Sequence, residues 1–163
     1  MVGPPAITLR PLERTDWRQV AEAYEDAVKS LAAPHYSPQQ IQAWAHYPDR
    51  NGGFTDALAQ GFGLVGTTTD RPGSVEAFAL LHPDDRLALL YCRARSSRRG
   101  LASQLVLALE ERARSMGQTR LRTEASQLSR PLLERLGWTV EEEERILFAG
   151  ESFLRWRMSR TLS

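Results

Sequence analysis

The residues of this chain with the clearest chemical potential are two arginines and a glycine in one polar turn, Arg98, Arg99 and Gly100. An apolar run, residues 87–92, precedes this turn, and apolar residues at helical spacing follow it from Leu101 onward. The pattern predicts a strand, a basic turn and a helix. Such a turn offers an anion unpaired backbone N–H groups and the positive end of a helix dipole, and Gly100 lets a ligand approach without a Cβ in the way. The alternative is an ordinary solvated turn with two surface arginines.

The candidate for acid–base chemistry is a carboxylate, Glu124, near the end of a predicted strand at residues 119–125. This strand should lie beside residues 87–92, so the carboxylate can point into the cleft above the basic turn. A surface glutamate paired with a neighbouring arginine is the alternative. Cys92 is a poorer candidate for a nucleophile, because it ends an apolar strand with no histidine partner in view.

The remaining elements are predicted from periodicity and from turn residues. We expect strands at residues 7–12, 62–69, 74–81, 87–92, 119–125, 138–148 and 152–158. We expect helices from Thr15 or Asp16 to Leu31, from the capping-box residue Ser37 to just before Pro48, from Leu101 to a C′ glycine at Gly117, and a short one from Ser126 or Ser129. Residues 49–53 read as a loop.

This order of elements predicts a mixed α/β fold, with one domain over residues 1–163. Its sheet would contain an antiparallel meander, then a parallel β-α-β crossover, and finally a C-terminal hairpin. Ligands in such sheets bind at the carboxyl ends of parallel strands, which is where the basic turn would lie. The predicted fold and the predicted anion site therefore agree.

Composition excludes several classes of protein. Hydrophobic residues make up 42% and charged residues 25% of the chain, as in globular proteins, and the net charge of +1 argues against a nucleic-acid partner. The single cysteine excludes an internal disulfide, the histidines show no metal-ligand spacing, and we expect no metal. Residues 1–5 lack the pattern of a leader, and no apolar run is long enough to span a membrane, so a soluble, cytoplasmic protein is expected.

Two blocks of the chain resemble the GNAT superfamily of N-acetyltransferases. Residues 90–94 followed by residues 97–102 resemble its coenzyme A signature, an apolar strand and then [Arg/Gln]-x-x-Gly-x-[Gly/Ala]. Ser97 stands where that signature has Arg or Gln, and Ala94 stands where Pro is common. Residues 123–138 resemble the later strand–helix–Gly-aromatic segment of the superfamily. The sequences of residues 123–126 and 36–44 are similar to those of a bacterial subgroup of the superfamily. The resemblance covers nearly the whole chain, with the motifs in the right order.

The resemblance implies a GNAT-like fold and acetyl transfer from acetyl-CoA to an amine of a small molecule or peptide, with a possible homodimer. The residues that it implies for coenzyme A are Leu90, Tyr91, Cys92, Arg98, Arg99, Gly100, Leu101, Ala102, Ser103 and Ser126. In this assignment the amides of Leu90 and Cys92 hold the pantetheine arm and polarise the thioester carbonyl. Glu124 is the expected general base, and Tyr36 and Tyr91 are the hydroxyls near the cleft. Leu133 occupies the position where the superfamily often carries a tyrosine acid.

Two alternatives from other classes stay open. One is a non-catalytic module that binds acetyl-CoA as a sensor, and the other is a partner-binding α/β domain whose basic turn binds nothing specific. The acceptor pocket would come from residues 32–56 and the final hairpin. The acidic run at residues 141–144 is either a solvated strand face or a cation-attracting rim of that pocket.

Overall fold

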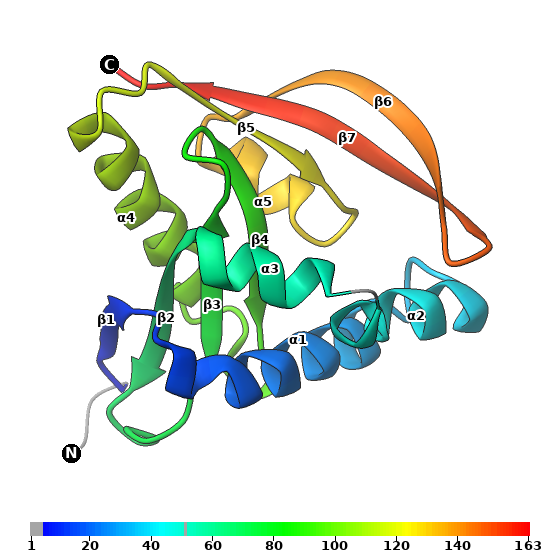
Figure 1. Ribbon diagram of the computed structural model, residues 1–163, viewed down its shortest axis with the longest axis horizontal. Helices are drawn as coiled ribbons and strands as arrows, with labels where there is room; N and C mark the ends of the chain where they lie inside the picture. The colour runs from blue at the N-terminus through cyan, green and yellow to red at the C-terminus, as the bar shows by residue number, and fades with distance from the viewer. Residues whose placement is uncertain (1–4, 51) are drawn as a thin grey trace.

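The computed structural model describes residues 5–50 and 52–163, so the expectations for residues 1–4 and for Asn51 lie outside the described part. A seven-stranded sheet with the order β1-β2-β3-β4-β5-β7-β6 organises the molecule (Figure 1). Its strands are β1 (Ile7–Pro11), β2 (Phe62–Thr68), β3 (Ala77–Leu81), β4 (Arg86–Cys92), β5 (Arg120–Ala125), β6 (Thr139–Phe148) and β7 (Glu151–Thr161). The α-helices are α1 (Trp17–Leu31), α2 (Pro38–Ala45), α3 (Gly53–Gln60), α4 (Leu101–Ser115) and α5 (Arg130–Arg135), and single 3₁₀ turns are η1 (Arg14–Asp16), η2 (Tyr47–Asp49) and η3 (Ala94–Ser96).

The predicted mixed α/β architecture is confirmed. Strands β1 to β4 form an antiparallel meander, and β6 and β7 form the C-terminal hairpin. Strand β4 runs parallel to β5, with α4 as the crossover between them. No helix in the described part of the chain is both long and apolar enough to cross a membrane.

The sheet opens between its two parallel strands. Pairing of β4 with β5 is limited to Arg86 with Arg122 and Leu87 with Thr123, and the Thr123 hydroxyl donates to the Leu87 carbonyl at 2.6 Å. Beyond this point β4 continues to Cys92 with no partner on its β5 side. The carboxyl half of β4 therefore borders an opening in the middle of the sheet.

Two buried clusters cover the two faces of the sheet. Helix α4 places Leu101, Leu105 and Leu109 against one face. Helix α1, which the sequence predicts, buries an apolar stripe, with Val20 and Tyr24 fully enclosed against the other face. Strand β4 thus contributes buried residues to both clusters, and β5 contributes Leu121 and Ala125 to the first.

Helix α3 is absent from the sequence-based prediction. Its N-terminal residue is preceded by Gly52 at φ +77, and no side chain among the described residues caps its first turn, so the usual start signals are missing. Phe54 and Leu58, one turn apart, are the residues that it buries. The helix is short, and burial of these two side chains against the second cluster is what stabilises it.

Several predicted boundaries also differ by up to three residues; β7, for example, ends at Thr161 instead of residue 158, and two other differences have a visible cause. The carboxylate of Asp16 does not cap α1; it accepts hydrogen bonds from Arg10 at 2.7 and 2.8 Å and from the Glu13 amide at 2.8 Å, and η1 precedes the helix. Strand β3 begins at Ala77 instead of Ser74, because the preceding residues turn a buried glutamate toward the basic turn. Neither difference alters the order of the sheet.

The C-terminal hairpin reaches across the molecule to α2 (Figure 1). The predicted capping box is confirmed, since the Gln40 amide donates to the Ser37 hydroxyl at 3.1 Å and the Gln40 side chain accepts from the Ser37 amide at 2.8 Å. The same Gln40 side chain donates to the Ser152 carbonyl of β7 at 2.8 Å. Segments far apart in sequence, residues 36–47 and the hairpin, therefore enclose a common space.

Candidate functional site

The basic turn ends in a backbone conformation that exposes amides. Arg98 at φ 63 and Gly100 at φ 91 both adopt the left-handed region, which costs a non-glycine residue roughly 1–2 kcal/mol. The amides of residues 98–103 donate hydrogen bonds to no other residue that the structure describes. They surround the N-terminus of a 15-residue helix, α4, where an anion is favoured.

A buried carboxylate, Glu76, anchors the residues directly before the basic turn. Arg95 donates to both of its oxygens at 2.9 and 2.7 Å, and the Ser96 hydroxyl donates at 2.6 Å. Burial alone would raise the pKa of Glu76, but hydrogen bonds from Arg95, Ser74 and Ser96 outweigh burial and lower this pKa to about 2. Sequence reasoning missed Glu76; the available signal was a lone acid directly before the apolar run of residues 77–81.

Helix α1 is attached to the same turn. The Asp26 carboxylate accepts from the Ala94 amide at 2.9 Å, and the Ser97 hydroxyl donates to the Ala94 carbonyl at 2.7 Å. Ser97 thus closes the turn locally, at the position where the resemblance leads one to expect a longer side chain. The segment before the basic turn is therefore held by Asp26 of α1, by Glu76 before β3 and by the Ser97 hydroxyl.

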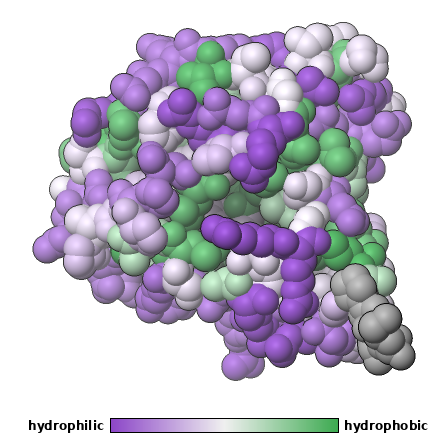
Figure 2. Space-filling view, turned by 180° about the vertical axis from the view of Figure 1, so that it is seen from behind, coloured by the Kyte–Doolittle hydropathy of each residue, from purple (hydrophilic) through white to green (hydrophobic). Residues whose placement is uncertain are grey.

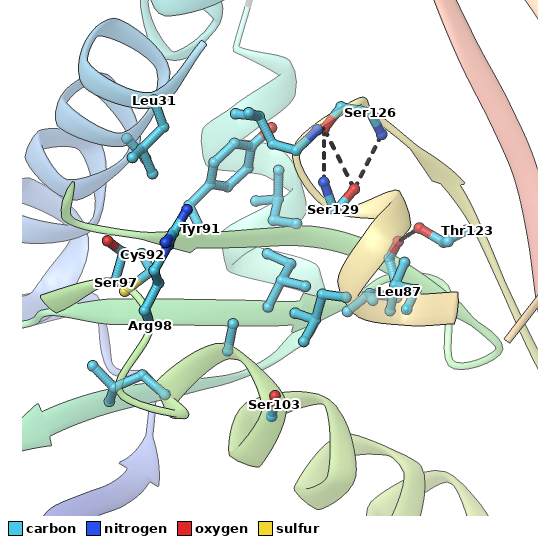
Figure 3. A pocket seen from close by; sticks show the side chains of 18 of the residues that line it. Leu31, Leu87, Tyr91, Cys92, Ser97, Arg98, Ser103, Thr123, Ser126 and Ser129 are labelled. Atoms are coloured by element: carbon cyan, nitrogen blue, oxygen red, sulfur yellow. Dashed lines mark hydrogen bonds between the residues drawn. The ribbon is translucent and has the colours of Figure 1, made fainter. Parts of the chain in front are cut away.

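A cleft of about 590 Å³ lies between this turn, the open edge of β4 and helix α5, and we call it the basic-turn cleft (Figure 3). Figure 2 shows the side of the molecule turned away from the viewer in Figure 1, where hydrophobic residues line a hollow that a hydrophilic side chain crosses. Of the residues predicted for a ligand, the cleft is lined by Leu90, Tyr91, Cys92, Arg98, Gly100, Leu101, Ala102, Ser103, Glu124 and Ser126. The structure therefore brings together residues from three separate parts of the sequence.

The two predicted arginines differ. Arg98 lines the cleft, and Figure 3 shows it close to Cys92 and Ser97. The Arg99 side chain does not line the cleft, and its guanidinium lies 3.7 Å from the Asp70 carboxylate. Arg99 therefore contributes its backbone amide, but not its side chain, to the donors that face an anion at this turn.

Strand β4 directs the backbone amides of alternate residues toward the cleft. The Arg93 amide donates to the Glu76 carbonyl at 2.8 Å, on the β3 side of the strand. Because neighbouring residues of a strand direct their amides to opposite edges, Cys92 and Leu90 direct theirs to the β5 side. That side is open beyond Leu87, so both amides face the basic-turn cleft.

The thiol of Cys92 is not set up as a nucleophile. Burial, followed by the nearby Glu76 carboxylate, raises the pKa of the Cys92 thiol to about 12, so the thiolate is scarce at neutral pH. The sulfur contacts the Arg93 carbonyl at 3.4 Å. These observations agree with the sequence-based interpretation of Cys92 as an inert residue.

A second space of about 340 Å³ adjoins the basic-turn cleft, and we call it the aromatic hollow. Its aromatic lining consists of Tyr24, Tyr36, Trp44, Tyr47, Tyr91, Phe148 and Phe153. The residues that line both this hollow and the basic-turn cleft are Ala88, Leu89, Tyr91, Glu124 and Ser126. The two spaces therefore meet at the point where β4 and β5 separate.

Glu124 lies at this junction. It is the only acidic residue lining either space in the part of the chain that the structure describes. Its carboxylate accepts a hydrogen bond from Arg86 at 2.9 Å, and 19% of its side chain is exposed. The two alternatives from the sequence are thus combined, because Glu124 is paired with a neighbouring arginine and also faces the cleft.

The two predicted tyrosines have different surroundings. Tyr91 accepts a hydrogen bond from the Trp44 indole at 3.2 Å, and burial raises the pKa of Tyr91 to about 12. Tyr36 lines the aromatic hollow only, and its hydroxyl accepts from the Gln127 amide at 2.9 Å. Burial raises the pKa of Tyr36 despite that hydrogen bond. Both phenols are protonated at neutral pH, so neither is a base.

Other candidates have structural surroundings. Leu133 is buried in the lining of the basic-turn cleft and offers no acid there. Residues 141–144 line neither space; their carboxylates pair with arginines of β5 and β7, or with Ser159 and Trp156. Among residues 5–50 and 52–163, no cluster of three or more histidine, cysteine or acidic side chains could hold a metal ion.

Comparison with known proteins identifies what this arrangement is similar to. Residues 32–160 match the family model described as "Acetyltransferase (GNAT) domain". The chain is 27% identical over 153 residues to an uncharacterised N-acetyltransferase, YafP, of Escherichia coli (strain K12), with 93% of this chain and 94% of that protein covered.

Many solved structures share the fold, and two of them serve as examples. One is a GCN5-related N-acetyltransferase from Rhodopseudomonas palustris, with a TM-score of 0.89, 27% identity and 99% of each chain covered. The other is the PaiA N-acetyltransferase of Thermoplasma acidophilum in complex with coenzyme A, with a TM-score of 0.76, 15% identity, and 96% of this chain and 99% of that chain covered.

Proposed function

The chain belongs to the family of GNAT acetyltransferase domains, and from this premise we propose that it transfers an acetyl group from acetyl-CoA to an amine of a small molecule or peptide. The observation that carries the proposal is the meeting of two separately lined spaces at Glu124. One space suits a long cosubstrate with an anionic end, and the other suits an acceptor. A two-substrate transfer needs such a junction, because the reacting atoms must come within about 3–3.5 Å of each other.

The residues of the basic-turn cleft fit coenzyme A. The unpaired amides of residues 98–103 and the guanidinium of Arg98 would hold the diphosphate. The amides of Leu90 and Cys92, at the open edge of β4, would hold the pantetheine arm and polarise the thioester carbonyl. The relative from Thermoplasma acidophilum, whose fold is similar, was solved with coenzyme A.

Glu124 is the general base in this proposal. An alkyl amine with a pKa of about 10.4 is mostly protonated at neutral pH and must lose a proton to attack. The carboxylate takes that proton, directly or through one water, and Arg86 keeps the carboxylate oriented toward the junction. Acetyl-CoA supplies the activated acetyl group.

The transfer itself forms one bond and breaks another. The amine nitrogen attacks the thioester carbonyl, the C–N bond forms, the C–S bond breaks, and the sulfur leaves with its electron pair. Because a thiol has a pKa of about 8.5, the leaving sulfur needs little help from an acid. A leucine at position 133 is therefore compatible with the reaction, and the protonated Tyr91 in the cleft lining is a candidate to assist departure.

We also propose a cytoplasmic location and a single domain. The only cysteine is half-buried with a raised thiol pKa, and it needs no oxidising compartment. One continuous sheet links the described residues from β1 to β6.

The experiment that tests the proposed function measures free-thiol release from acetyl-CoA with a panel of amines, together with calorimetric binding of acetyl-CoA. Amine-dependent thiol release with matching acetylated product supports the transferase. Binding with no release for any amine would replace it with the sensor module. Absence of binding would leave only the partner-binding domain.

A further inference from the structure

The aromatic hollow has a specific wall composition that the proposed reaction does not by itself require. Its rings come from α1, from the α1–α2 connection, from α2, from η2, from β4 and from both strands of the hairpin. They contact one another mainly edge to face, with ring centroids 5.2 Å apart for Tyr36 and Trp44 and 5.8 Å apart for Tyr47 and Phe148. A further ring placed among them would find the same favourable geometry.

The charges in this hollow are already paired. Among the described residues, the charged side chains in its lining are Arg86, Glu124 and Arg155. Arg86 pairs with Glu124 at 2.9 Å, and Arg155 pairs with Glu144 of β6 at 2.6 Å. No lining charge is therefore left over to neutralise a carboxylate or a second ammonium group on an acceptor, and burying such a charge without a partner is costly.

The volume limits the acceptor as well. At about 340 Å³, the hollow lies near the lower end of the range for small-molecule sites, so it suits one small molecule better than an extended chain. Because Glu124 lies at the junction with the basic-turn cleft, the amine end of the acceptor must point there. The body of the acceptor then lies between the rings.

We propose that the acceptor is a small primary amine on an aromatic or bulky apolar body, with no carboxylate and no second ammonium group. This inference rests on the proposed acetyl transfer and adds the substrate class. The rings recognise the apolar body, Glu124 receives the proton of the amine, and the paired arginines give no advantage to an acidic acceptor.

The test compares amines that differ by one feature at a time. We would measure kcat/KM by thiol release for 2-phenylethylamine, for phenylalanine, which adds a carboxylate, for n-butylamine, which lacks the ring, and for spermidine, a polycation. We expect 2-phenylethylamine to exceed each of the others by about tenfold or more, the size of an unpaired buried charge or a lost ring contact. Equal or better turnover of phenylalanine or spermidine would overturn the inference while leaving the transferase function in place.

Direct binding separates failure of the inference from failure of the function. If no amine is acetylated, calorimetry of 2-phenylethylamine with the CoA-saturated protein decides. Selective binding without turnover would support the ligand class and reject the transferase. No binding of 2-phenylethylamine would overturn the ligand class as well.

Two neighbouring residues of β6 provide matched variants. Phe148 lines the hollow, whereas the preceding residue, Leu147, does not line it and is 78% exposed. Phe148→Ala should lower kcat/KM for 2-phenylethylamine by about tenfold with the KM for acetyl-CoA unchanged, and Leu147→Ala should change neither.

A reversal variant keeps the inference testable even if a lost ring disturbs packing. Phe148→Glu replaces this ring of the hollow with an acid, and it should shift the preference from 2-phenylethylamine toward spermidine. An unchanged preference in both Phe148 variants, with folding verified by circular dichroism, would show that the rings do not select the acceptor.

Discussion

Glu124 is the residue on which the proposed chemistry depends most directly. It lines both spaces and is the only acid that does so in the described part of the chain. Replacing it with glutamine keeps the size and removes the base. We expect Glu124→Gln to lower kcat by about 10²- to 10⁴-fold with acetyl-CoA affinity nearly intact, and its residual rate to rise with pH as the free amine deprotonates unaided.

A matched control for this variant is Glu134→Gln on α5. Glu134 is exposed, pairs with Arg130 at 2.8 Å and lines neither space, so its loss removes the same charge outside the junction. Its kcat should match that of the wild type. Wild-type turnover in the Glu124 variant would remove Glu124 from the mechanism and leave a water chain as the route for the proton.

Arg98 and Arg99 are adjacent in sequence, but the structure gives them different surroundings. Arg98 lines the basic-turn cleft, and Arg99 lies 3.7 Å from Asp70. We expect Arg98→Ala to weaken binding of CoA by about tenfold or more, with little effect on pantetheine, which lacks the diphosphate.

Arg99→Ala is the matched control, and it should leave both affinities close to those of the wild type. Calorimetric titration of each variant with CoA and with pantetheine measures the effect. Equal losses for both ligands in the Arg98 variant would mean that this arginine does not contact the diphosphate.

At the scale of elements, the conformation of the basic turn depends on Glu76 at the start of β3. Its carboxylate collects Arg95 and Ser96 from η3 and is fully buried. Glu76→Gln should destabilise the fold by about 3 kcal/mol and also weaken CoA binding, because a buried charged network loses its acceptor and the turn loosens. Urea unfolding and CoA titration measure the two effects.

Glu110→Gln is the control for the second effect. Glu110 is also buried, on α4, where it contacts Trp138 at 3.3 Å and Arg160 at 3.5 Å, and it does not line the cleft. Its variant should lose stability without a matching loss of CoA affinity. Similar losses of affinity in both variants would show that Glu76 acts on overall stability alone.

The same carboxylate predicts a pH dependence of stability. Hydrogen bonds lower the pKa of Glu76 from 4.5 to about 2, so its contribution to the free energy of unfolding is complete above pH 4.5 and is lost as the pH falls toward 2. We expect the wild type to lose stability over this interval more steeply than Glu76→Gln, measured by denaturant unfolding from pH 6 to pH 2. Parallel curves would contradict the assignment.

At the scale of the whole molecule, a ligand in the basic-turn cleft touches β4, α4, β5 and α5 together. Acetyl-CoA at about a hundred times its Kd should therefore raise the free energy of unfolding by about 2.7 kcal/mol, which corresponds to about 5–10 °C in Tm for a chain of this size. Differential scanning fluorimetry with and without ligand measures this shift.

Gly100→Glu should abolish the thermal shift, because it adds a side chain and a negative charge where the diphosphate would bind. Gly73→Glu introduces the same residue at an exposed turn where a Cβ meets nothing within 4 Å, and it should retain the shift. An unchanged Tm of the wild type with saturating ligand would reject both the enzyme and the sensor interpretations.

The sequence alone determined most of the helices and strands and, of the two spaces of the site, the basic-turn cleft. The α1 stripe, the capping box at Ser37, the parallel β4–β5 pair and the basic turn were all readable, because they depend on periodicity and on neighbours along the chain. Helix α3 was not readable, since its few buried residues are stabilised by tertiary contacts and no side chain caps it.

Tertiary structure decided how the site residues are partnered. Three contacts join segments that are distant in sequence, so no local pattern predicts them. They are the pairs Glu124 with Arg86, Arg99 with Asp70, and Glu76 with Arg95. The aromatic hollow likewise exists only because the hairpin folds back onto α2. Sequence patterns record the preferences of neighbouring residues along the chain, whereas which charges meet and which rings share a space depends on packing of the whole fold.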